Sequence, residues 1–329
     1  MLNQTTKKLL HATKNLLAFS GGGDSTALLF LLLENDIPFD IAIVDYGLRE
    51  QSKEEVAYAK ELSTKYGFKC FVATAPEFKR NFEANARAFR YNFFESLIAS
   101  RNYTTLLTAH HLGDKLEWFL MQFCKGAGCV ELSGLREIEE REDYKLIRPL
   151  LTLEKSTLIN YCQNKNIKYF TDESNSDEHY KRNYFRANFA RPLLEKYASG
   201  IAKSFEYLEQ DSSALIQKTE LKKCNQLAYF SSVNKRSDIY HIDRYLKSIG
   251  HIITAKEREL LMQKEELVVG RKYAIAWQKG YVFIAPYLHA TSFTKEFKKK
   301  MRHLGIAPKL RSYLAEDLEA VELLSLLLQ

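Results

Sequence analysis

Short apolar segments alternate with amphipathic segments along the first 150 residues. Apolar runs of strand-forming residues occur at 16–19, 40–46, 68–74 and 104–109. Between these runs, hydrophobic residues recur with helical spacing at 25–35, 52–66, 82–101 and 112–125. A further strand is expected at Lys145–Arg148, after a charged loop at 136–143. Strands that alternate with helices of this length predict a parallel sheet with helices on both faces.

The pattern becomes mainly helical after residue 150. Helices are expected at 153–165, roughly 178–197, roughly 200–222 and 253–265. Two strands, 272–277 and 281–287, are expected to form a hairpin closed by the three-residue turn Gln278-Lys279-Gly280. The last stretch, 294–329, is basic at first and then reads as a leucine-rich helix. We therefore expect an α/β chain in three parts, with boundaries at 1–200, 201–290 and 291–329.

Composition is ordinary for a globular protein, except that the chain carries a net positive charge. The chain has 329 residues, of which 46% are hydrophobic, and this length favours two or three domains. Its five cysteines are scattered without a CxxC pair, which argues against a disulfide framework or a structural metal site. The longest apolar run near the N-terminus, 27–33, is too short to span a bilayer, so we expect a cytoplasmic protein without membrane association. A formal net charge of +7 is compatible with a polyanionic partner.

Residues 19–27, FSGGGDSTA, lie between two apolar runs and carry the first chemical signal. They connect an expected strand to an expected helix, which is the place where parallel sheets bind ligands. Glycines there let the backbone approach a ligand, and the amides at the start of the helix form an anion site. Asp24 does not suit a phosphate site unless it faces a divalent cation. The loop is therefore predicted to bind a nucleotide together with its metal ion.

The type of phosphate loop can be narrowed by elimination. The pattern GxxxxGK[ST] is absent, because no lysine follows the glycines, and this disfavours a kinase or GTPase loop. The pattern GxGxxG does not fit either, because Gly23 is followed by Asp24 and Ser25 and no later glycine completes it. Residues 20–25, SGGGDS, resemble the SGGxDS signature of the PP-loop ATP pyrophosphatases. This resemblance implies a Rossmann-like domain whose loop grips the pyrophosphate part of ATP.

Further stretches resemble one family within that superfamily, the tRNA(Ile)-lysidine synthetases. In chain order, the matching stretches are Asn81–Arg87 with Arg90-Tyr91, Thr108–Glu117 (TAHHLGDKLE), Arg148–Leu151 (RPLL), and Asp172–Asn175 with Arg182–Arg186. Together with the glycine loop they cover about residues 15–195. The region 215–287 resembles the family's tRNA-binding insert only weakly. The resemblance implies a PP-loop catalytic domain at 1–200, a tRNA-binding domain at 201–290 and a basic, helical tail at 291–329.

Three titratable residues of the second stretch are expected to share one face. His110 follows an expected buried strand, and Asp114 and Glu117 lie four and seven residues further along, on the same side of the next helix. Such a group beside a phosphate loop suits a metal-and-base site better than a hydrophobic core.

Basic residues outside this group have more ordinary alternatives. Glu83 and Arg87 could form a surface ion pair, while Arg87 or Arg90 could instead point toward phosphate. Lys181, Arg182 and Arg186 could be a solvated face. The tail segment 294–312 carries seven Lys or Arg residues against one Glu, which favours contact with a phosphate backbone.

The resemblance implies a reaction as well as a fold. ATP would adenylate the C2 oxygen of cytidine 34 in the CAU anticodon of isoleucine tRNA, and the ε-amine of free L-lysine would then displace AMP. The implied requirements are ATP, Mg²⁺, lysine and this tRNA, and a homodimer is compatible with them. The residues implied to bind ATP are Ser20, Gly21, Gly22, Gly23, Asp24 and Ser25. Asp24 would also bind Mg²⁺, and the residues implied to act in catalysis are Asp24, His110, Asp114 and Glu117. The residues implied to bind tRNA or phosphate are Arg87, Arg90, Arg182, Asn183 and Arg186.

Two other functions remain open from the sequence. A PP-loop tRNA sulfurtransferase also adenylates a base carbonyl but needs reactive cysteines, for which Cys124 and Cys129 are the only closely spaced pair. A non-catalytic RNA-binding protein could also have retained the nucleotide fold. The intact loop and the HHxxDxxE pattern argue against such a loss of activity.

Overall fold

The computed structural model forms two compact units, Met1–Gln210 and Asp211–Gln329. The residues it describes are 1–47, 50–78, 80–171, 181–289 and 292–328. This division differs from the three parts expected from the sequence. The difference arises because the tail residues Met301, Leu310 and Leu324 are buried in the core of the second unit and form no separate part. No helix of the described residues is long and apolar enough to cross a membrane.

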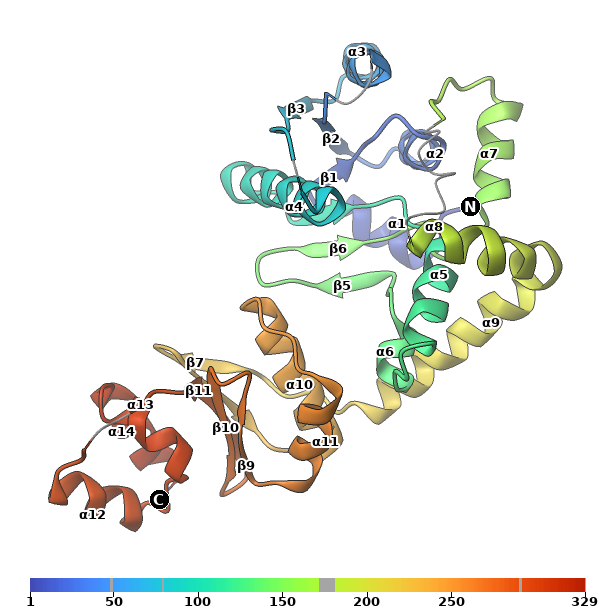
Figure 1. Ribbon diagram of the computed structural model, residues 1–329. Helices are drawn as coiled ribbons and strands as arrows, with labels where there is room; N and C mark the ends of the chain where they lie inside the picture. The colour runs from blue at the N-terminus through green and yellow to red at the C-terminus, as the bar shows by residue number, and fades with distance from the viewer. Residues whose placement is uncertain (48–49, 79, 172–180, 290–291, 329) are drawn as a thin grey trace. The chain divides into compact units, whose positions relative to one another are not determined.

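The first unit begins with alternating strands and helices, as the hydrophobic pattern predicts (Figure 1). In order, its elements are α1 (Gln4–His11), β1 (Asn15–Ala18), α2 (Gly23–Leu33), β2 (Phe39–Asp45), α3 (Glu50–Tyr66), β3 (Cys70–Thr74), α4 (Phe82–Arg101), β4 (Thr105–Leu107), α5 (Leu112–Phe123), α6 (Cys129–Ser133), β5 (Ile138–Glu140), β6 (Lys145–Ile147), α7 (Lys155–Asn164), α8 (Lys181–Phe185), the π-helix η2 (Arg186–Ala190) and α9 (Arg191–Leu215).

The six strands of the first unit form one sheet in the order β3-β2-β1-β4-β6-β5. All neighbours pair in parallel except β5 and β6, which are antiparallel. The parallel strands confirm the prediction, but the expectation of a loop at 136–143 is wrong, because Ile138–Glu140 is the edge strand β5. An edge strand needs pairing on one side only, so charged residues can be included without burying them.

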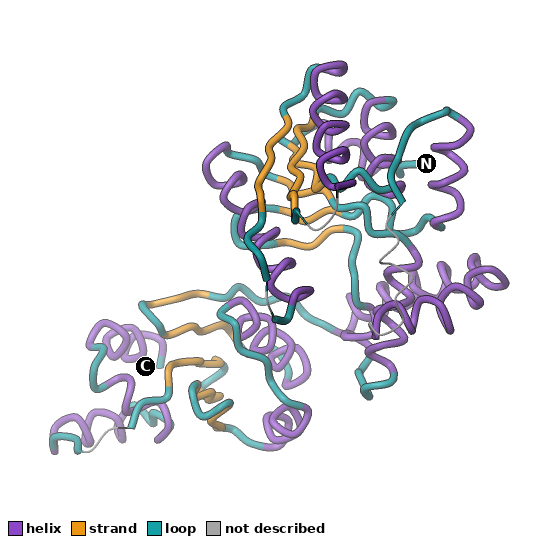
Figure 2. The backbone as a smooth tube through the Cα atoms, turned by 45° about the horizontal axis from the view of Figure 1, so that its top comes forward, coloured by secondary structure: helices purple, strands orange, loops and turns teal. Residues whose placement is uncertain are grey.

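Side chains on alternate positions of these strands build a core on each face of the sheet, and Figure 2 shows the strands of this sheet running between helices. On one face, Leu17, Ile41 and Leu107 pack with residues of α2, α3 and α7. On the other face, Leu16 and Leu106 pack with residues of α4. Burial on both faces explains why the strands read as continuous apolar runs. Because β1, β2 and β4 run in parallel, their carboxyl ends lie at the same edge of the sheet.

The helices after residue 180 differ in detail from the sequence prediction. Expected helices at 178–197 and 200–222 are one run in the structure, formed by α8, η2 and α9, with a kink at Tyr197. The run ends at Leu215, and residues 216–221, expected to be helical, form a non-helical connection that leads to the strand β7 (Lys222–Cys224).

The second unit is an antiparallel sheet with helices on both faces. Its remaining elements are β8 (Leu227–Ser231), α10 (Lys235–Ser248), α11 (Ala255–Gln263), β9 (Glu266–Val269), β10 (Tyr273–Gln278), β11 (Tyr281–Pro286), α12 (Lys295–His303), the 3-10 helix η3 (Pro308–Leu310), α13 (Arg311–Leu314) and α14 (Leu318–Leu327). The strand order is β7-β8-β11-β10-β9. Residues of α10 and α11 pack on one face, and residues of α12 to α14 pack on the other.

The predicted hairpin is present, with a shorter turn than expected. Gln278 pairs with Tyr281, which leaves Lys279 and Gly280 as a two-residue loop. Both residues have positive φ, 44° and 79°. Two positive φ values in a two-residue loop match the hairpin turn whose twist fits the flanking strands. Gln278 thus belongs to the strand rather than to the turn.

Candidate active site

The glycine loop follows β1 at the sheet edge where the carboxyl ends of β1 and its neighbour β4 lie. Gly21 has φ of 75°, a left-handed conformation that favours glycine. A Cβ atom on Gly23 would lie 2.5 Å from Ile159 Cδ1, so a larger residue there would force the Ile159 side chain to shift. Gly22 precedes α2 and has no side chain to cap it, so the amides of the first helical turn face outward. Outward-facing amides at a helix start form an anion site.

The two serines of the loop hold its shape. The Ser20 amide donates to Ser25 Oγ at 3.2 Å, and Ser25 Oγ donates to the Gly22 carbonyl at 3.0 Å. Phe170 donates its amide to the Gly21 carbonyl at 2.9 Å, which ties the loop to a distant segment. The loop is therefore organised in advance, and its first-turn amides stay available to a ligand.

Asp24 is the acidic residue of the loop, and one of its oxygens lacks a partner. Oδ2 lies 3.8 Å from His111 Nε2 and 3.9 Å from Lys155 Nζ. Oδ1 is buried, and no described residue forms a hydrogen bond with it. Burial raises the pKa of Asp24, whereas His111 and Lys155 oppose that shift. A buried carboxylate oxygen without a donor fits a cation, so Asp24 fits the role predicted for a Mg²⁺ ligand.

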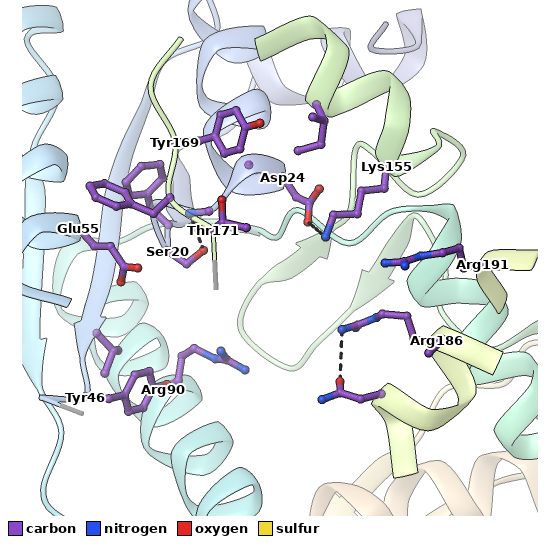
Figure 3. A pocket seen from close by; sticks show the side chains of 18 of the residues that line it. Ser20, Asp24, Tyr46, Glu55, Arg90, Lys155, Tyr169, Thr171, Arg186 and Arg191 are labelled. Carbon is purple, nitrogen blue, oxygen red and sulfur yellow. Dashed lines mark hydrogen bonds and ion pairs between the residues drawn. The ribbon is translucent and has the colours of Figure 1, made fainter. Parts of the chain in front are cut away.

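A cavity of about 760 Å³ opens in front of this loop. This volume falls within the range usual for small-molecule sites. Figure 3 shows Arg90 entering from one side, Arg186 and Arg191 from the other, and Lys155 pointing toward Asp24. The other lining residues are Phe19, Ser20, Gly22, Gly23, Val44, Tyr46, Glu55, Phe94, Ile159, Tyr169, Phe170, Thr171, Asn183 and Ala187. Four basic side chains around one cavity suit a polyanionic ligand such as a triphosphate.

His110 and His111 follow β4 and have different surroundings. His110 Nδ1 lies 2.9 Å from Thr108 Oγ1, and burial lowers the pKa of His110 to about 4. His111 caps α5, because its Nδ1 accepts the Gly113 amide at 3.0 Å and its own amide donates to Asp114 Oδ2 at 2.9 Å. His111, which the prediction did not single out, is the histidine that reaches Asp24. The capping-box spacing of His111 and Asp114 is a sequence signal that could have identified it.

Asp114 and Glu117 lie together on α5, as predicted, and arginines hold both of them. Arg182 donates to Asp114 Oδ1 at 2.5 Å and to Glu117 Oε2 at 2.8 Å. Arg186 donates to Glu117 Oε1 at 2.6 Å and to Glu117 Oε2 at 3.2 Å. The Glu117 side chain is only 2% exposed. Residues predicted to act in catalysis and in tRNA binding thus form one ion-pair network.

The ion-pair network also sets the charge of Asp114. Burial alone would raise its pKa, but His111, His110 and Arg182 outweigh burial and lower the pKa to about 2. Asp114 is therefore ionised throughout the physiological range. Among the described residues, no group of three or more His, Cys, Asp or Glu side chains is arranged to hold a metal ion. A metal at this site would therefore take ligands from the substrate as well as from Asp24, as Mg²⁺ does with nucleotide phosphates.

The remaining predicted residues separate into two groups. Arg90 and Asn183 line the cavity, whereas Arg87 is not among the described lining residues and lies over the Tyr91 ring at 4.9 Å. Arg148, the first residue of RPLL, is 3% exposed and bonds to Glu139 and to the Arg136 carbonyl, so it anchors β5. The stretch Asp172–Asn175 lies outside the described residues.

Several cavity residues escaped the sequence prediction. Lys155, Arg191, Tyr46 and Glu55 line the cavity beside the predicted residues. They come from α7, from α9, from the residue after β2, and from α3, and none was predicted to be a site residue. Only the folded chain brings them together.

Comparison with known proteins identifies the family. The PP-loop domain family matches residues 1–193. The tRNA(Ile)-lysidine synthase of Wolinella succinogenes is 42% identical over 306 residues, which is 92% of this chain and 93% of that protein. That of Helicobacter pylori is 40% identical over 303 residues, 92% of this chain and 89% of that protein. The chain belongs to the tRNA(Ile)-lysidine synthase family.

Other members of the tRNA(Ile)-lysidine synthase family give the same picture. The Campylobacter jejuni protein is 40% identical over 307 residues, 93% of this chain and 94% of that protein. Membership confirms the family resemblance and the α/β, PP-loop fold class predicted from the sequence, and with them the prediction of an ATP-using enzyme. The roles of individual residues stay predictions.

Proposed function

We propose that this protein ligates free L-lysine to C2 of cytidine 34 in the CAU anticodon of isoleucine tRNA at the expense of ATP. Family membership supports the reaction. The structural observation that carries the proposal is the cavity at the glycine loop, where outward-facing amides meet Asp24 and four basic side chains.

The reaction balances in two steps. In the first, the C2 oxygen of cytosine attacks the α-phosphorus of ATP, so a C–O–P linkage forms and pyrophosphate leaves. In the second, the neutral ε-amine of lysine adds to C2, the C2–O bond breaks and AMP leaves with the oxygen. The added nitrogen loses its proton to a base. The first step is needed because oxide is a poor leaving group and AMP is a good one.

The residues of the cavity are assigned roles by position. Loop residues 20–25 hold the diphosphate that leaves, and Lys155, Arg186 and Arg191 balance its charge. Mg²⁺ held by Asp24 would neutralise the charge that builds up between the phosphates. His110 is not among the described residues that line the cavity; because its pKa is about 4 it is neutral at pH 7, and its proposed role is to accept a hydrogen bond or a proton.

Binding of tRNA also involves the second unit in this proposal. The helix α12 presents exposed basic side chains at Lys295, Lys298, Lys299, Lys300 and Arg302, while Met301 is buried in the core. This arrangement suits a phosphate backbone, which binds through charge without reading sequence.

Replacing Lys298, Lys299 and Lys300 with alanine should lower the slope of log affinity against log salt by about 2 to 3, since each phosphate contact adds about 0.9 for a duplex.

The test of the proposed function is direct. Full-length protein is incubated with ATP, Mg²⁺, labelled lysine and isoleucine tRNA with a CAU anticodon, and the label is sought in the anticodon nucleoside. A methionine tRNA with the same anticodon serves as the control. We expect label, AMP and pyrophosphate in equal amounts with the first tRNA only. Release of pyrophosphate without incorporation of lysine would contradict the proposal.

The sulfurtransferase alternative finds no support at the cavity. Cys124 is exposed at the end of α5, Cys129 begins α6, and neither lines the cavity as described. The double change Cys124→Ser, Cys129→Ser should leave lysine incorporation within about twofold of wild type, as expected for surface substitutions. Sulfur transfer that disappears in this variant would restore the alternative.

A further inference from the structure

The helical run from α8 to α9 exposes a group of aromatic rings. Tyr184 and Phe189 are 45% and 42% exposed, and their ring centroids lie 5.8 Å apart. Phe185 lies 5.4 Å from Phe189. We name Tyr184, Phe185 and Phe189 the aromatic cluster. Large apolar side chains that gather on a surface, rather than being scattered singly, indicate an interaction site.

The aromatic cluster belongs to the same run of helix as the cavity wall. Ala190 and Leu194 pack with Leu112 and Leu116 of α5, which fixes one face of the run. A second face lines the cavity through Asn183 and Arg191. The π-helix η2 lies between these two residues, and such wide turns often occur at functional sites because they reorient the side chains around them. The cluster therefore lies on the same packed helical run as residues that line the cavity.

Charge around the aromatic cluster limits the kinds of partner. Residues 181–197 contain five basic residues and one acidic residue, Glu195. Arg182 and Arg186 are engaged with carboxylates of α5, whereas Lys181, Arg191 and Lys196 are exposed. A second copy of this chain packed symmetrically here would place these like charges against one another. The surface instead suits a partner that offers both negative charge and flat apolar groups.

Unpaired RNA has both features. Its phosphates are anionic, and its unstacked bases lie against aromatic side chains with an energy that hardly depends on sequence. We propose that the aromatic cluster stacks on unpaired anticodon-loop bases next to the modified cytidine, while Lys181 and Lys196 contact the neighbouring phosphates. This inference rests on the proposed function, because it takes the anticodon loop as the substrate.

The experiment uses an RNA hairpin with a CAU loop in which 2-aminopurine replaces the adenine of the anticodon. The fluorescence of this base falls when it stacks on an aromatic ring, so the readout reports stacking itself. Full-length wild-type protein should bind the hairpin and quench the fluorescence. The double variant Tyr184→Ala, Phe189→Ala should bind about 10- to 100-fold more weakly and lose the quench.

Two control variants make the result specific to the aromatic cluster. Tyr184→Phe with Phe189→Tyr keeps both rings and should keep affinity and quench. Tyr207→Ala removes a ring of similar exposure, 54%, from α9, further along the same helical run and outside the cavity lining as described, and should change neither. Unchanged melting temperatures would show that all variants fold.

Each outcome has a separate meaning. Unchanged affinity and quench in the double alanine variant would overturn the inference even if lysine incorporation proceeds. A wild-type dimer that the same variant converts to a monomer, with RNA binding retained, would make the surface a self-association site and also overturn it. Wild-type protein that binds and quenches the hairpin but incorporates no lysine into tRNA would overturn the proposed function instead.

Discussion

The glycine loop and the carboxylate face of α5 both carry acidic motif residues at one edge of the sheet, yet they are in opposite states. Asp24 has one buried oxygen without a partner among the described residues, and the side chains of His111 and Lys155 lie 3.8 and 3.9 Å from its other oxygen. Both oxygens of Glu117 are occupied by guanidinium groups. An acidic residue in a motif can therefore be open to a ligand, or it can already be paired with basic residues of the protein.

This contrast assigns the two residues to different tasks. In the proposed function, Asp24 would bind a cation that arrives with the nucleotide. Glu117 holds Arg186, whose guanidinium lines the cavity, so it acts on the ligand through the arginine. On this account Glu117 is a positioning residue and Asp24 a ligand-binding one.

The largest expected effect is on activity, at Asp24. Asp24→Asn removes the charge that would bind the metal ion, and we expect lysine incorporation to fall by at least about 10²- to 10³-fold. Stability should hold or rise, because burial raises the pKa of this carboxyl and the neutral amide avoids that cost. Steady-state assays and urea unfolding measure both quantities. A variant that keeps a tenth of the activity would remove Asp24 from the metal site.

At Glu117 the larger effect should be on stability. Glu117→Gln leaves Arg182 and Arg186 without their shared carboxylate, and breaking such a buried pair costs about 3–5 kcal/mol. The exposed pair of Lys145 and Glu140, 3.2 Å apart, is the matched control, and Glu140→Gln should cost less than about 1 kcal/mol. Urea unfolding compares the two variants. Equal costs would show that the network on α5 is no stronger than a surface ion pair.

His110 and Asp114 should affect the pH dependence of stability in different pH ranges. The folded pKa of His110 is about 4, below its ordinary 6.5, so the unfolded chain binds a proton that the folded chain does not. Stability should therefore fall between pH 6.5 and 4, by roughly 3 kcal/mol for a shift of this size. Asp114 has a folded pKa of about 2, so its stabilisation persists until pH falls below 3.8. His110→Gln should flatten the unfolding free energy between pH 6.5 and 4, and an unchanged slope would contradict this.

The smallest effect is expected at Lys155, which faces Asp24 across the cavity. Lys155→Met should raise the KM for ATP about 10-fold with a smaller change in kcat, as for the loss of one contact to a charged group. Lys165 lies at the other end of α7 and pairs with Glu34, so Lys165→Met is the matched control and should leave the KM unchanged. The same KM in both variants would exclude Lys155 from the phosphate site.

Much of the fold and part of the site could be predicted from local patterns. The alternation of apolar and amphipathic segments specified the parallel strands and the helices between them, because burial on both faces requires such runs. Segments with short strands or mixed charge were missed, including β5 at Ile138–Glu140. β4 and β6 are equally short but were recognised by their apolar residues, whereas two of the three residues of β5 are glutamates and carry no strand pattern.

The sequence alone determined the nature of the glycine loop, because its conformation follows from adjacent residues: a left-handed glycine, two serines and the start of a helix. Only the tertiary structure decided which charged residues are open and which are paired. Glu117 and Arg186 are 69 positions apart, and Asp24 and Lys155 come from different helices. Contacts between distant segments depend on how the helices pack on the sheet, and a local pattern of residues does not predict that packing.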